Sequence, residues 1–465
     1  MGAVHGFEHV GPSLIPQSAD LRVHVCGAHA RVFQIAVALN LCRMTCKGKR
    51  KGPMRKVIVI GAGINGVSAA IWLRRMGADV TLVDKGLPGQ GASFGNAGVL
   101  AASAVVPLTT PGLMTKAPGM LLDSDFPLFM RWGYLPRMVP WLLRYAAHAN
   151  DRDTRRIAAA LLPVIGDTLD QHLALTEGLP SRRFIAPSDY TFAYASRAAF
   201  QADRYTWDLR RSAGFEPKLL EGDALRAYEP TLGSAIRCLG VLGGHGHILD
   251  PGGYVAALAA DFAAMGGTVM QTEVQDVTLE AGQITEVLTS QGTLPCDAAV
   301  LSAGVWSGPL ARRLGLRVPM ESERGYHLML RGVSGGPKVP VMVESGKFVA
   351  TPMAEGLRLA GIVEFGGLRA SASRAPLELL RRQARRAFPG LTWQSEEPWM
   401  GHRPAPSDSL PLVGEIGKTG VFTAFGHHHI GLTGGPKTGR WVAGLIAGQP
   451  TNADLAPYDP NRFRR

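Results

Sequence analysis

A glycine-rich turn between a buried strand and a helix constrains the fold of this chain more than any other feature. Residues 56–60 read Lys-Val-Ile-Val-Ile, which is typical of a buried parallel strand. Gly61, Gly63 and Gly66 follow, and residues 64–76 carry apolar side chains at helical spacing. In such a unit the glycines permit the tight turn, the approach of backbone N–H groups to a pyrophosphate, and close packing of helix on strand. The partial positive charge of the helix N-terminus favours the phosphates, so the pattern predicts a dinucleotide-binding fold.

A second strand and a terminal acid complete this unit. Residues 79–83 are predicted to form a strand that ends at Asp84, 18 residues after Gly66. An acidic side chain at this place can accept hydrogen bonds from a ribose diol. Because all the parts occur in order, a glycine-rich turn without a ligand is the less favoured interpretation. NAD and FAD both satisfy the unit, so this part of the chain does not distinguish between them.

The sequence after Asp84 favours FAD. A nicotinamide domain would usually continue with alternating strands and helices, whereas residues 89–100 form a loop of small residues that can lie against a flat ring. Further pieces of the nucleotide fold are predicted much later, as a helix at 252–264, strands near 268–274 and 298–304, and a helix at 436–447. The N-terminus of the last helix could face the flavin and stabilise its reduced form. The nucleotide domain is therefore predicted to be interrupted, with the insertions building a substrate domain.

Composition excludes several other classes of protein. The chain has 465 residues, 46% of them hydrophobic and 18% charged, which excludes a disordered protein and suits two domains. No run of about 18 apolar residues occurs, so no transmembrane helix is expected. Five cysteines exclude a disulfide scaffold and indicate a reducing compartment. The net charge of +12 occurs without the motifs of a nucleic-acid module, so it is only weak evidence for anionic substrates or acidic surfaces. An ordinary arginine-rich composition is the favoured explanation of this charge.

Residues 1–53 differ in character from the rest of the chain. They hold seven basic and two acidic residues and so contribute +5 of the net charge. An apolar run at 32–42 precedes a basic cluster at 47–51, which is the reverse of the order in a signal peptide. We interpret this segment as a disordered extension or a mis-called start, with a targeting role as the less favoured alternative.

Several further motifs point to one family. Besides residues 61–66, they are 93–98, 351–353, 356–361, 363–365, 401–404, 408–411 and 426–439. Together they resemble the FAD-dependent amino-acid oxidoreductases that include D-amino-acid oxidase, glycine oxidase and sarcosine oxidase, and most of all the bacterial D-amino-acid dehydrogenases. The resemblance covers the chain from about residue 54 to about residue 448.

The resemblance implies FAD as the cofactor and hydride transfer from the substrate Cα to flavin N5. The imine that results from a primary amine would hydrolyse to a 2-oxo acid and ammonia. The residues expected to bind the FAD are Gly61, Ala62, Gly63, Ile64, Gly66, Asp84, Lys85, Ser93, Asn96, Ala97, Gly98, Val274, Gly431, Leu432 and Thr433.

Three residues are expected to bind the substrate. An amino-acid carboxylate needs a cationic partner, for which arginine is the best donor. Arg403 matches the position at which related oxidases bind that carboxylate, with pairing to Asp408 as the alternative. Tyr326 matches a position that often faces the substrate, with a packed strand tyrosine as the alternative. His429 is the third; because it is one of three consecutive histidines, which cannot all point at one ion, no metal is expected. No side chain is assigned a catalytic role.

Two further segments leave alternatives open. Lys347 would favour oxygen as the electron acceptor if it lay near flavin N5, but a solvated loop lysine is the favoured interpretation. Residues 127–149 combine tryptophan and tyrosine with arginine, which suits a membrane interface, although a helix packing its tryptophans inward is slightly favoured. Residues 323–326 and 427–429 depart from the dehydrogenase pattern, so the identity of the amine stays open.

The sequence thus predicts an α+β or α/β flavoprotein with an interrupted FAD-binding Rossmann-type domain and a second, sheet-plus-helix substrate domain. The FAD-binding domain is assigned to 54–105, 240–310 and 400–450, the substrate domain to 106–239 and 311–399, and a C-terminal tail to 451–465. The predicted function is oxidative deamination of D-amino acids, with electrons passed to a quinone-type acceptor. The alternatives are an oxidase or dehydrogenase for glycine, sarcosine, D-hydroxyproline or another secondary amine, and a non-catalytic FAD-binding subunit of a larger complex. The expected location is cytoplasmic, with peripheral contact to the inner membrane as an option and no nucleic-acid partner.

Overall fold

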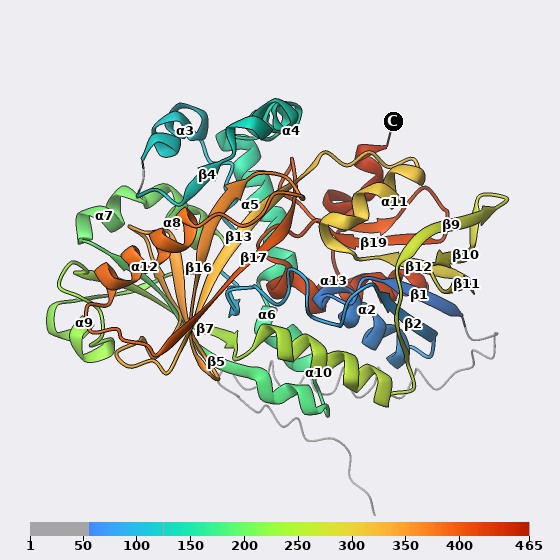
Figure 1. Cartoon of the computed structure of the whole chain (residues 1–465), viewed down its shortest axis with the longest axis horizontal. Helices are drawn as coiled ribbons and strands as arrows, with labels where there is room; N and C mark the ends of the chain where they lie inside the picture. The colour runs from blue at the N-terminus through green and yellow to red at the C-terminus, as the bar shows by residue number, and fades with distance from the viewer. Residues whose placement is uncertain (1–54, 124, 465) are drawn as a thin grey trace, which may run out of the picture. The chain divides into compact units, whose positions relative to one another are not determined.

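Two large β-sheets organise the part of the chain that the structure, a computed structural model, describes: residues 55–123 and 125–464 (Figure 1). One sheet has six strands and the other has ten. A smaller sheet of three strands contains β9 (Val274–Glu280), β10 (Gln283–Thr289) and β11 (Gly292–Pro295). The prediction made for residues 1–53 lies outside the described residues.

The six-stranded sheet is mainly parallel, and distant stretches of the chain supply its strands. In order across the sheet, these are β18 (Leu412–Glu415), β19 (Val421–Phe425), β12 (Ala298–Leu301), β1 (Lys56–Ile60), β2 (Asp79–Asp84) and β8 (Thr268–Gln271). Only the pairing of β18 with β19 is antiparallel. β1, β12 and β19 are buried along almost their whole length, as expected for parallel strands covered on both faces. The strand order shows the interruption that the sequence predicts.

Three helices cover one face of this sheet: α2 (Ile64–Arg75), α10 (Pro251–Ala264) and α13 (Gly431–Ile446). α2 and α13 approach each other closely because a Cβ atom at Gly439 would lie 2.6 Å from the backbone of Ala69. On the other face, apolar residues of β1 and β12 pack against the three-stranded sheet and α11 (Ser307–Arg313). The sheet is therefore fixed from both sides, with the ends of its strands free to line a site.

Helix α13 begins at Gly431, five residues before the start predicted from Pro436. A proline inside a helix has no N–H to donate to the carbonyl four residues earlier, here that of Leu432. The ring Nε2 of His172 lies 3.0 Å from this carbonyl oxygen and supplies the missing hydrogen bond. The prediction was wrong because the partner that allows the helix to pass through Pro436 is more than 250 residues away in the sequence.

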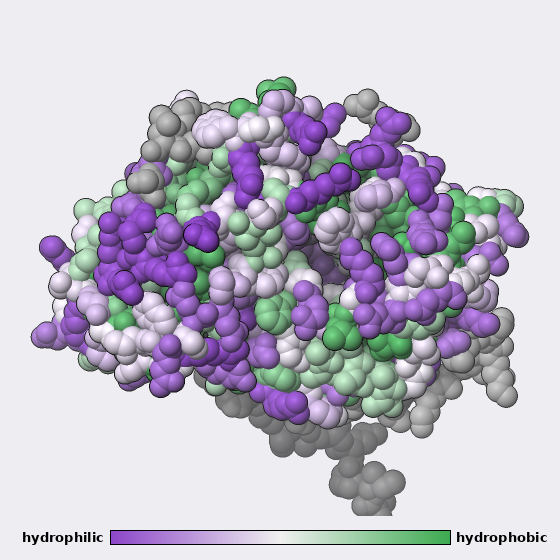
Figure 2. All heavy atoms as spheres, viewed as in Figure 1, coloured by the Kyte–Doolittle hydropathy of each residue, from purple (hydrophilic) through white to green (hydrophobic). Residues whose placement is uncertain are grey.

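The ten-stranded sheet is mainly antiparallel. Its main path runs β17 (Ser395–Pro406), β13 (Met320–Arg331), β16 (Gly356–Phe365), β15 (Phe348–Met353), β14 (Val341–Val343), β5 (Ile185–Tyr194), β7 (Cys238–Ile248) and β3 (Val99–Leu100), while β4 (Leu128–Met130) pairs with β16 and β6 (Lys218–Glu221) with β7. Helix α12 (Ala375–Ala387) packs on this sheet through Leu379 and Leu380. Hydrophilic residues gather on the surface over α12, the face opposite its buried leucines (Figure 2).

The remaining helices belong mostly to the long stretch between β3 and β7. They are α3 (Leu113–Leu122), α4 (Leu135–Ala147), α5 (Asp151–Ile165), α6 (Thr168–Leu175), α7 (Arg197–Ala202), α8 (Arg204–Ser212) and α9 (Gly222–Tyr228). Short 3-10 helices span Trp132–Tyr134, Pro180–Phe184, Gly304–Trp306, Ala456–Tyr458 and Pro460–Phe463.

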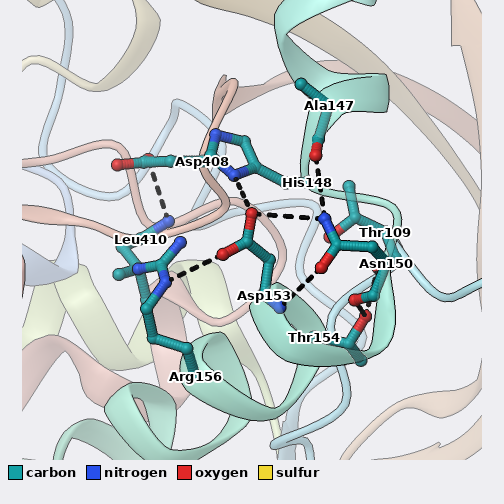
Figure 3. A network of polar contacts seen from close by, with 9 residues as sticks. All are labelled: Thr109, Ala147, His148, Asn150, Asp153, Thr154, Arg156, Asp408 and Leu410. Carbon is teal, nitrogen blue, oxygen red and sulfur yellow. Dashed lines mark hydrogen bonds and ion pairs between the residues drawn. The ribbon is translucent and has the colours of Figure 1, made fainter.

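A polar network fixes the turn between α4 and α5 (Figure 3). The side chain of Asn150 caps α5 by accepting a hydrogen bond from the backbone N–H of Asp153 at 3.0 Å. The carboxylate of Asp153 lies 2.9 Å from His148 Nδ1. Thr154 Oγ1 donates to the Thr109 carbonyl at 2.8 Å and ties α5 to the segment before α3. These contacts fix the ends of the chain segment that carries α3 and α4.

Sheet membership does not follow all the predicted domain boundaries. β7 crosses residue 240 and β17 crosses residue 400, yet both strands belong entirely to the ten-stranded sheet. Helices α5 and α6, assigned to the substrate domain, contribute Ile157, Val164 and Leu175 to the apolar core around α2 and α13. Such placements depend on long-range pairing, which a local pattern does not contain.

Candidate active site

A cavity of about 1480 Å³ extends from the carboxyl ends of β1 and β12 to β13 and β17 of the larger sheet. Of the fifteen residues predicted to bind FAD, all except Gly66 and Gly98 line it. Of those predicted to bind substrate, Arg403 and His429 line it and Tyr326 does not. The structure therefore brings most of the predicted site together from segments more than 300 residues apart.

The glycine-rich turn has the geometry that its sequence predicts. Gly61 has a φ of +109°, and a Cβ atom there would lie 2.7 Å from the backbone of Ser302. A Cβ atom at Gly66 would overlap the Gly61 carbonyl and lie 2.6 Å from Ser302 Oγ. Gly66 therefore acts from behind the turn, by letting α2 approach the sheet, and leaves contact with a ligand to Gly63 and its neighbours.

Two helix N-termini, those of α2 and α13, meet at the cavity. Neither helix has an acidic residue in its first turn or a side chain capping it. Asn65 of α2 and Leu432 of α13 both line the cavity. The N–H of Ile64 donates a hydrogen bond to Ser93 Oγ at 3.1 Å. The dipoles of the two helices favour an anionic ligand here, which fits the diphosphate and the reduced ring of a flavin dinucleotide.

Asp84 holds the turn while keeping capacity to bind a ligand. Its carboxylate accepts hydrogen bonds from the N–H of Ala62 at 2.7 Å and of Gly86 at 2.9 Å. A carboxylate offers about four acceptor positions, so two remain for the hydroxyls of a ribose. Asp84 lines the cavity, as do Lys85, which follows β2, and Val274, the first residue of β9. This arrangement fits the predicted ribose-binding role.

The loop at residues 93–98 is held by two buried side chains that the sequence analysis missed. Arg358 on β16 donates to the carbonyls of Phe94 and Asn96 at 2.8 and 2.7 Å. His327 Nδ1 on β13 lies 3.1 Å from the Gly95 carbonyl. Burial lowers the pKa of Arg358 to about 10 and that of His327 to about 3. A charged residue between apolar neighbours of a strand, as in Arg358, was the available signal in the sequence.

Arg403 presents its guanidinium to the cavity from β17. Its Nη1 donates to the Ile362 carbonyl at 3.2 Å. A Cβ atom at Gly325, on the neighbouring strand, would lie 2.6 Å from the guanidinium, so glycine at this place gives Arg403 its room. Burial lowers the pKa of Arg403, and the nearby Glu323 raises it. The alternative partner, Asp408, pairs instead with Arg462 at 2.8 Å.

Glu323 lies opposite Arg403 in the pairing of β13 with β17 and was not predicted as a site residue. It lines the cavity, although only 2% of its surface is exposed. Burial raises the pKa of Glu323, and the positive charge of Arg403 opposes this effect. A carboxylate beside an arginine in the cavity provides both charges that a zwitterion would need.

The three consecutive histidines have separate surroundings. His427 is buried between Asn65, at 3.1 Å, and Thr438, at 2.9 Å. His428 has a φ of +54°, and its Nδ1 lies 3.3 Å from Glu323 Oε2. His429 lines the cavity. Burial lowers the pKa of all three to about 3, so the imidazoles are neutral near pH 7.

Tyr326 lies on the opposite face of β13 from the cavity, which corrects the predicted contact with substrate. Successive side chains of a strand point to opposite faces, so Glu323 and Gly325 face the cavity and Tyr326 does not. Its hydroxyl donates to Glu364 at 2.5 Å and accepts from the N–H of Ser373 at 2.9 Å. The alternative, a packed strand tyrosine, describes this residue.

Lys347 lies at the outer part of the cavity and forms an ion pair with Glu344. Its side chain is 49% exposed. This position agrees with the favoured interpretation of a solvated loop lysine.

An apolar arm of the cavity runs along the segment that carries α3 and α4. It is lined by Leu113, Phe126, Leu128, Met138, Trp141 and Leu142. Trp141 packs inward on Tyr145, with ring centroids 4.5 Å apart, and donates to the Ala405 carbonyl at 3.0 Å. Trp132, in contrast, is 61% exposed. No helix in the described residues is long and apolar enough to cross a membrane.

Residues 56–445 match the sequence family described as DAO: FAD dependent oxidoreductase. A D-amino-acid oxidase of Bradyrhizobium diazoefficiens is 37% identical over 417 residues, which are 88% of this chain and 99% of that protein. A D-amino acid dehydrogenase of Paramagnetospirillum magneticum is 30% identical over 425 residues, with 88% and 99% covered.

Solved structures with the same fold include the glycine oxidase of Geobacillus kaustophilus, with a TM-score of 0.65 and 23% identity. That match covers 88% of this chain and 99% of the oxidase. The L-proline dehydrogenase from P. horikoshii has a TM-score of 0.66 and 18% identity, with 88% and 98% covered.

Proposed function

Because this chain belongs to the FAD dependent oxidoreductase (DAO) family, we propose that it oxidises D-amino acids to 2-oxo acids and ammonia. The predicted family, fold class and cofactor are confirmed, and FAD is the cofactor. The observation that supports an amino-acid substrate is the guanidinium of Arg403 in the cavity, held to the chain by one hydrogen bond to Ile362. The preference for the D configuration rests on the names of the relatives at 37% and 30% identity.

FAD, when bound, supplies the two-electron oxidant that accepts a hydride from the substrate Cα. We assign its diphosphate to the turn at Gly61–Gly63 and Ser93, and its ribose to Asp84. Lys85, Asn96, Ala97, Val274 and Gly431–Thr433 complete the assigned contacts, with Gly66 and Gly98 acting through the backbone. The strand side chains Arg358 and His327 fix the 93–98 loop in advance, so the chain need not be ordered when the cofactor binds.

The protein's own contribution to the reaction is orientation. Arg403 can hold the substrate carboxylate with two parallel N–H···O hydrogen bonds, which fixes the rotation of the head group as well as its place. His429 lines the same part of the cavity with a neutral ring. A fixed carboxylate restricts the orientation of the Cα–H bond, and such orientation accounts for a large part of the rate enhancement available to an enzyme.

We propose a quinone-type electron acceptor, supported by the apolar arm of the cavity along α3 and α4. We also propose a cytoplasmic location with peripheral contact to the inner membrane on the same side, because Val139 and Leu143 of α4 are 39% and 67% exposed. Hydrophobic atoms are visible at the surface over α4 (Figure 2). Exposed apolar side chains beside an apolar arm would let a lipid-soluble acceptor enter directly.

The test is an anaerobic titration of the purified full-length holoenzyme, followed by flavin absorbance. Loss of the oxidised flavin spectrum with D-amino acids but not with L-amino acids or sarcosine is the expected result. Recovery should be fast with a soluble quinone analogue and slow in air. Bleaching by sarcosine or glycine would replace the proposed substrate by these amines, and rapid recovery in air would replace the proposed quinone acceptor by oxygen, which makes the protein an oxidase. An unchanged spectrum with every amine would leave a non-catalytic flavoprotein.

A further inference from the structure

We propose that Glu323 and Arg403 together bind the head group of a zwitterionic α-amino acid, with Glu323 holding the ammonium and accepting its proton. Arg403 holds the carboxylate, as above. The inference rests on the proposed function and deepens it, because it assigns a proton acceptor to a site for which no catalytic residue was predicted.

The pairing register of β13 and β17 places Glu323 and Arg403 close together. Glu323 and Arg403 are direct cross-strand partners, and both line the cavity. Side chains in that relation have Cβ atoms about 4.5–5.5 Å apart. An amino acid carries its carboxylate and its ammonium on one carbon, so a molecule bound to Arg403 has its nitrogen next to Glu323. The missing side chain at Gly325 leaves space on the same face of β13.

One carboxylate oxygen of Glu323, Oε2, lacks a hydrogen-bond donor within residues 55–123 and 125–464, although the neutral ring of His428 places its Nδ1 3.3 Å away. Only 2% of the residue is exposed. Buried polar atoms in proteins are nearly always paired, and an unpaired one often marks a binding or catalytic role. An ammonium group donates three hydrogen bonds and carries the opposite charge. It is therefore the donor this oxygen lacks.

Among the described ionisable groups that surround Glu323, none other than Glu323 is suited to accept a proton near pH 7. Arg403 faces it from β17, His428 and His429 from the loop before α13, and Tyr145 from α4. Burial lowers the pKa of both histidines to about 3 and raises that of Tyr145 well above 10. None of these three gains or loses a proton readily near pH 7. Burial raises the pKa of Glu323, which strengthens it as a proton acceptor.

The neighbours of Glu323 on its own strand are occupied elsewhere. Arg324 pairs with Glu364 at 3.1 Å, on the far face of the strand. Glu321 accepts hydrogen bonds from the hydroxyl of Tyr134 at 3.1 Å and from a backbone N–H at 2.8 Å. Glu321 is buried at 8% exposure and does not line the cavity, so it is a matched control for Glu323.

The proton transfer balances with the redox step. One N–H bond of the substrate ammonium breaks, its proton goes to a Glu323 carboxylate oxygen, and the electron pair stays on nitrogen. That pair forms the C=N bond of the protonated imine as the Cα hydrogen leaves with its two electrons for FAD, the oxidant. The substrate thus loses one proton to Glu323 and one hydride to the cofactor, and Glu323 returns the proton to water after product release.

The test compares wild-type holoenzyme with Glu323→Gln and, as the control, Glu321→Gln. Calorimetry measures the Kd of 2-methylalanine, a zwitterion with no Cα hydrogen to transfer, and of 2-methylpropanoate, which has the carboxylate alone. In wild type and Glu321→Gln, we expect 2-methylalanine to bind more tightly than 2-methylpropanoate. In Glu323→Gln, its Kd should rise about tenfold to about a hundredfold, from the loss of one charged hydrogen bond, with the Kd of 2-methylpropanoate no weaker.

The second readout is the pH dependence of anaerobic flavin reduction. At pH 7, Glu323→Gln should reduce its flavin about 10²- to about 10⁴-fold more slowly with a D-amino acid. The rate should recover as pH rises toward the pKa of the free substrate ammonium, a shift that a merely structural role would not produce. Equal binding of the two ligands by wild type, or an unchanged ligand preference and pH profile in Glu323→Gln, overturns the inference. Wild-type flavin that no amino acid reduces overturns the proposed function instead, while the calorimetry still decides the role of Glu323.

Discussion

Replacing Arg403 by alanine should raise KM by a large factor while leaving FAD in place. The guanidinium lies in the cavity next to Gly325, where a bound carboxylate would be shielded from water. Removing one member of such a buried ion pair costs about 2–5 kcal/mol, which corresponds to about 30-fold to about 4000-fold in KM. The loss to folding should be smaller, because Arg403 makes one hydrogen bond, to Ile362; a single bond of this kind contributes about 1.5–3 kcal/mol.

The assay is steady-state kinetics with a D-amino acid, together with the flavin-to-protein ratio of each variant. Arg403→Lys keeps the charge but not the planar fork, so its KM should lie between those of wild type and Arg403→Ala. Arg331→Ala removes surface ion pairs with Glu355 and Glu397 at the far end of β13 and should leave KM unchanged. A normal KM in Arg403→Ala with full flavin content would show that the carboxylate binds elsewhere.

Three further perturbations test the structure around the site. Gly66→Ala places a Cβ atom 2.6 Å from the Ser302 hydroxyl, so it should lower the flavin content and reduce the free energy of unfolding by at least about 1–3 kcal/mol. Gly444→Ala in α13, with nothing within 4 Å of the new atom, should change neither quantity. Equal flavin content in the two variants would contradict the close packing of α2. Tyr326→Phe should cost about 1–3 kcal/mol in urea unfolding, because Glu364 and a backbone N–H lose their partner, while KM stays unchanged; a raised KM with normal stability would restore the substrate role. Burial lowers the pKa of His172 to about 4, so below pH 6.5 the unfolded chain binds a proton at this residue that the native state does not bind. The free energy of unfolding should therefore fall by about 1.4 kcal/mol per pH unit between pH 6.5 and 4 from this site. In His172→Gln the free energy of unfolding should fall less steeply with pH, and an unchanged dependence on pH would refute the assignment.

Much of the cofactor site follows from local sequence because its chemistry is carried by backbone. Gly61 and Gly66 are required by close approach to Ser302, and the strands and helix around them form from short-range patterns. The positions of Asp84 and the 93–98 loop follow from the same unit. In each case the information needed lies within a few residues.

The substrate side of the cavity could be predicted only in part. Arg403 was found through a motif, but Glu323 was not, because its role depends on the pairing of β13 with β17, about 80 residues apart. Tyr326 was placed on the wrong face for a related reason: the sequence names the strand but does not say which alternate residues face inward. Arg358 and His327 act on a loop more than 230 residues away, and no local pattern links them to it.

The sequence by itself determined the dinucleotide unit, the interruption of its sheet and the family, since each depends on residues that are close together or on recurring motifs. Tertiary structure alone decided the start of α13 at Gly431, where His172 replaces the hydrogen bond that Pro436 cannot make. It also decided which charges meet in the cavity. Facing strands can bring any two side chains together, and their register is set by the packing of the whole sheet, so the neighbourhood of Glu323 and Arg403 exists only in the folded chain.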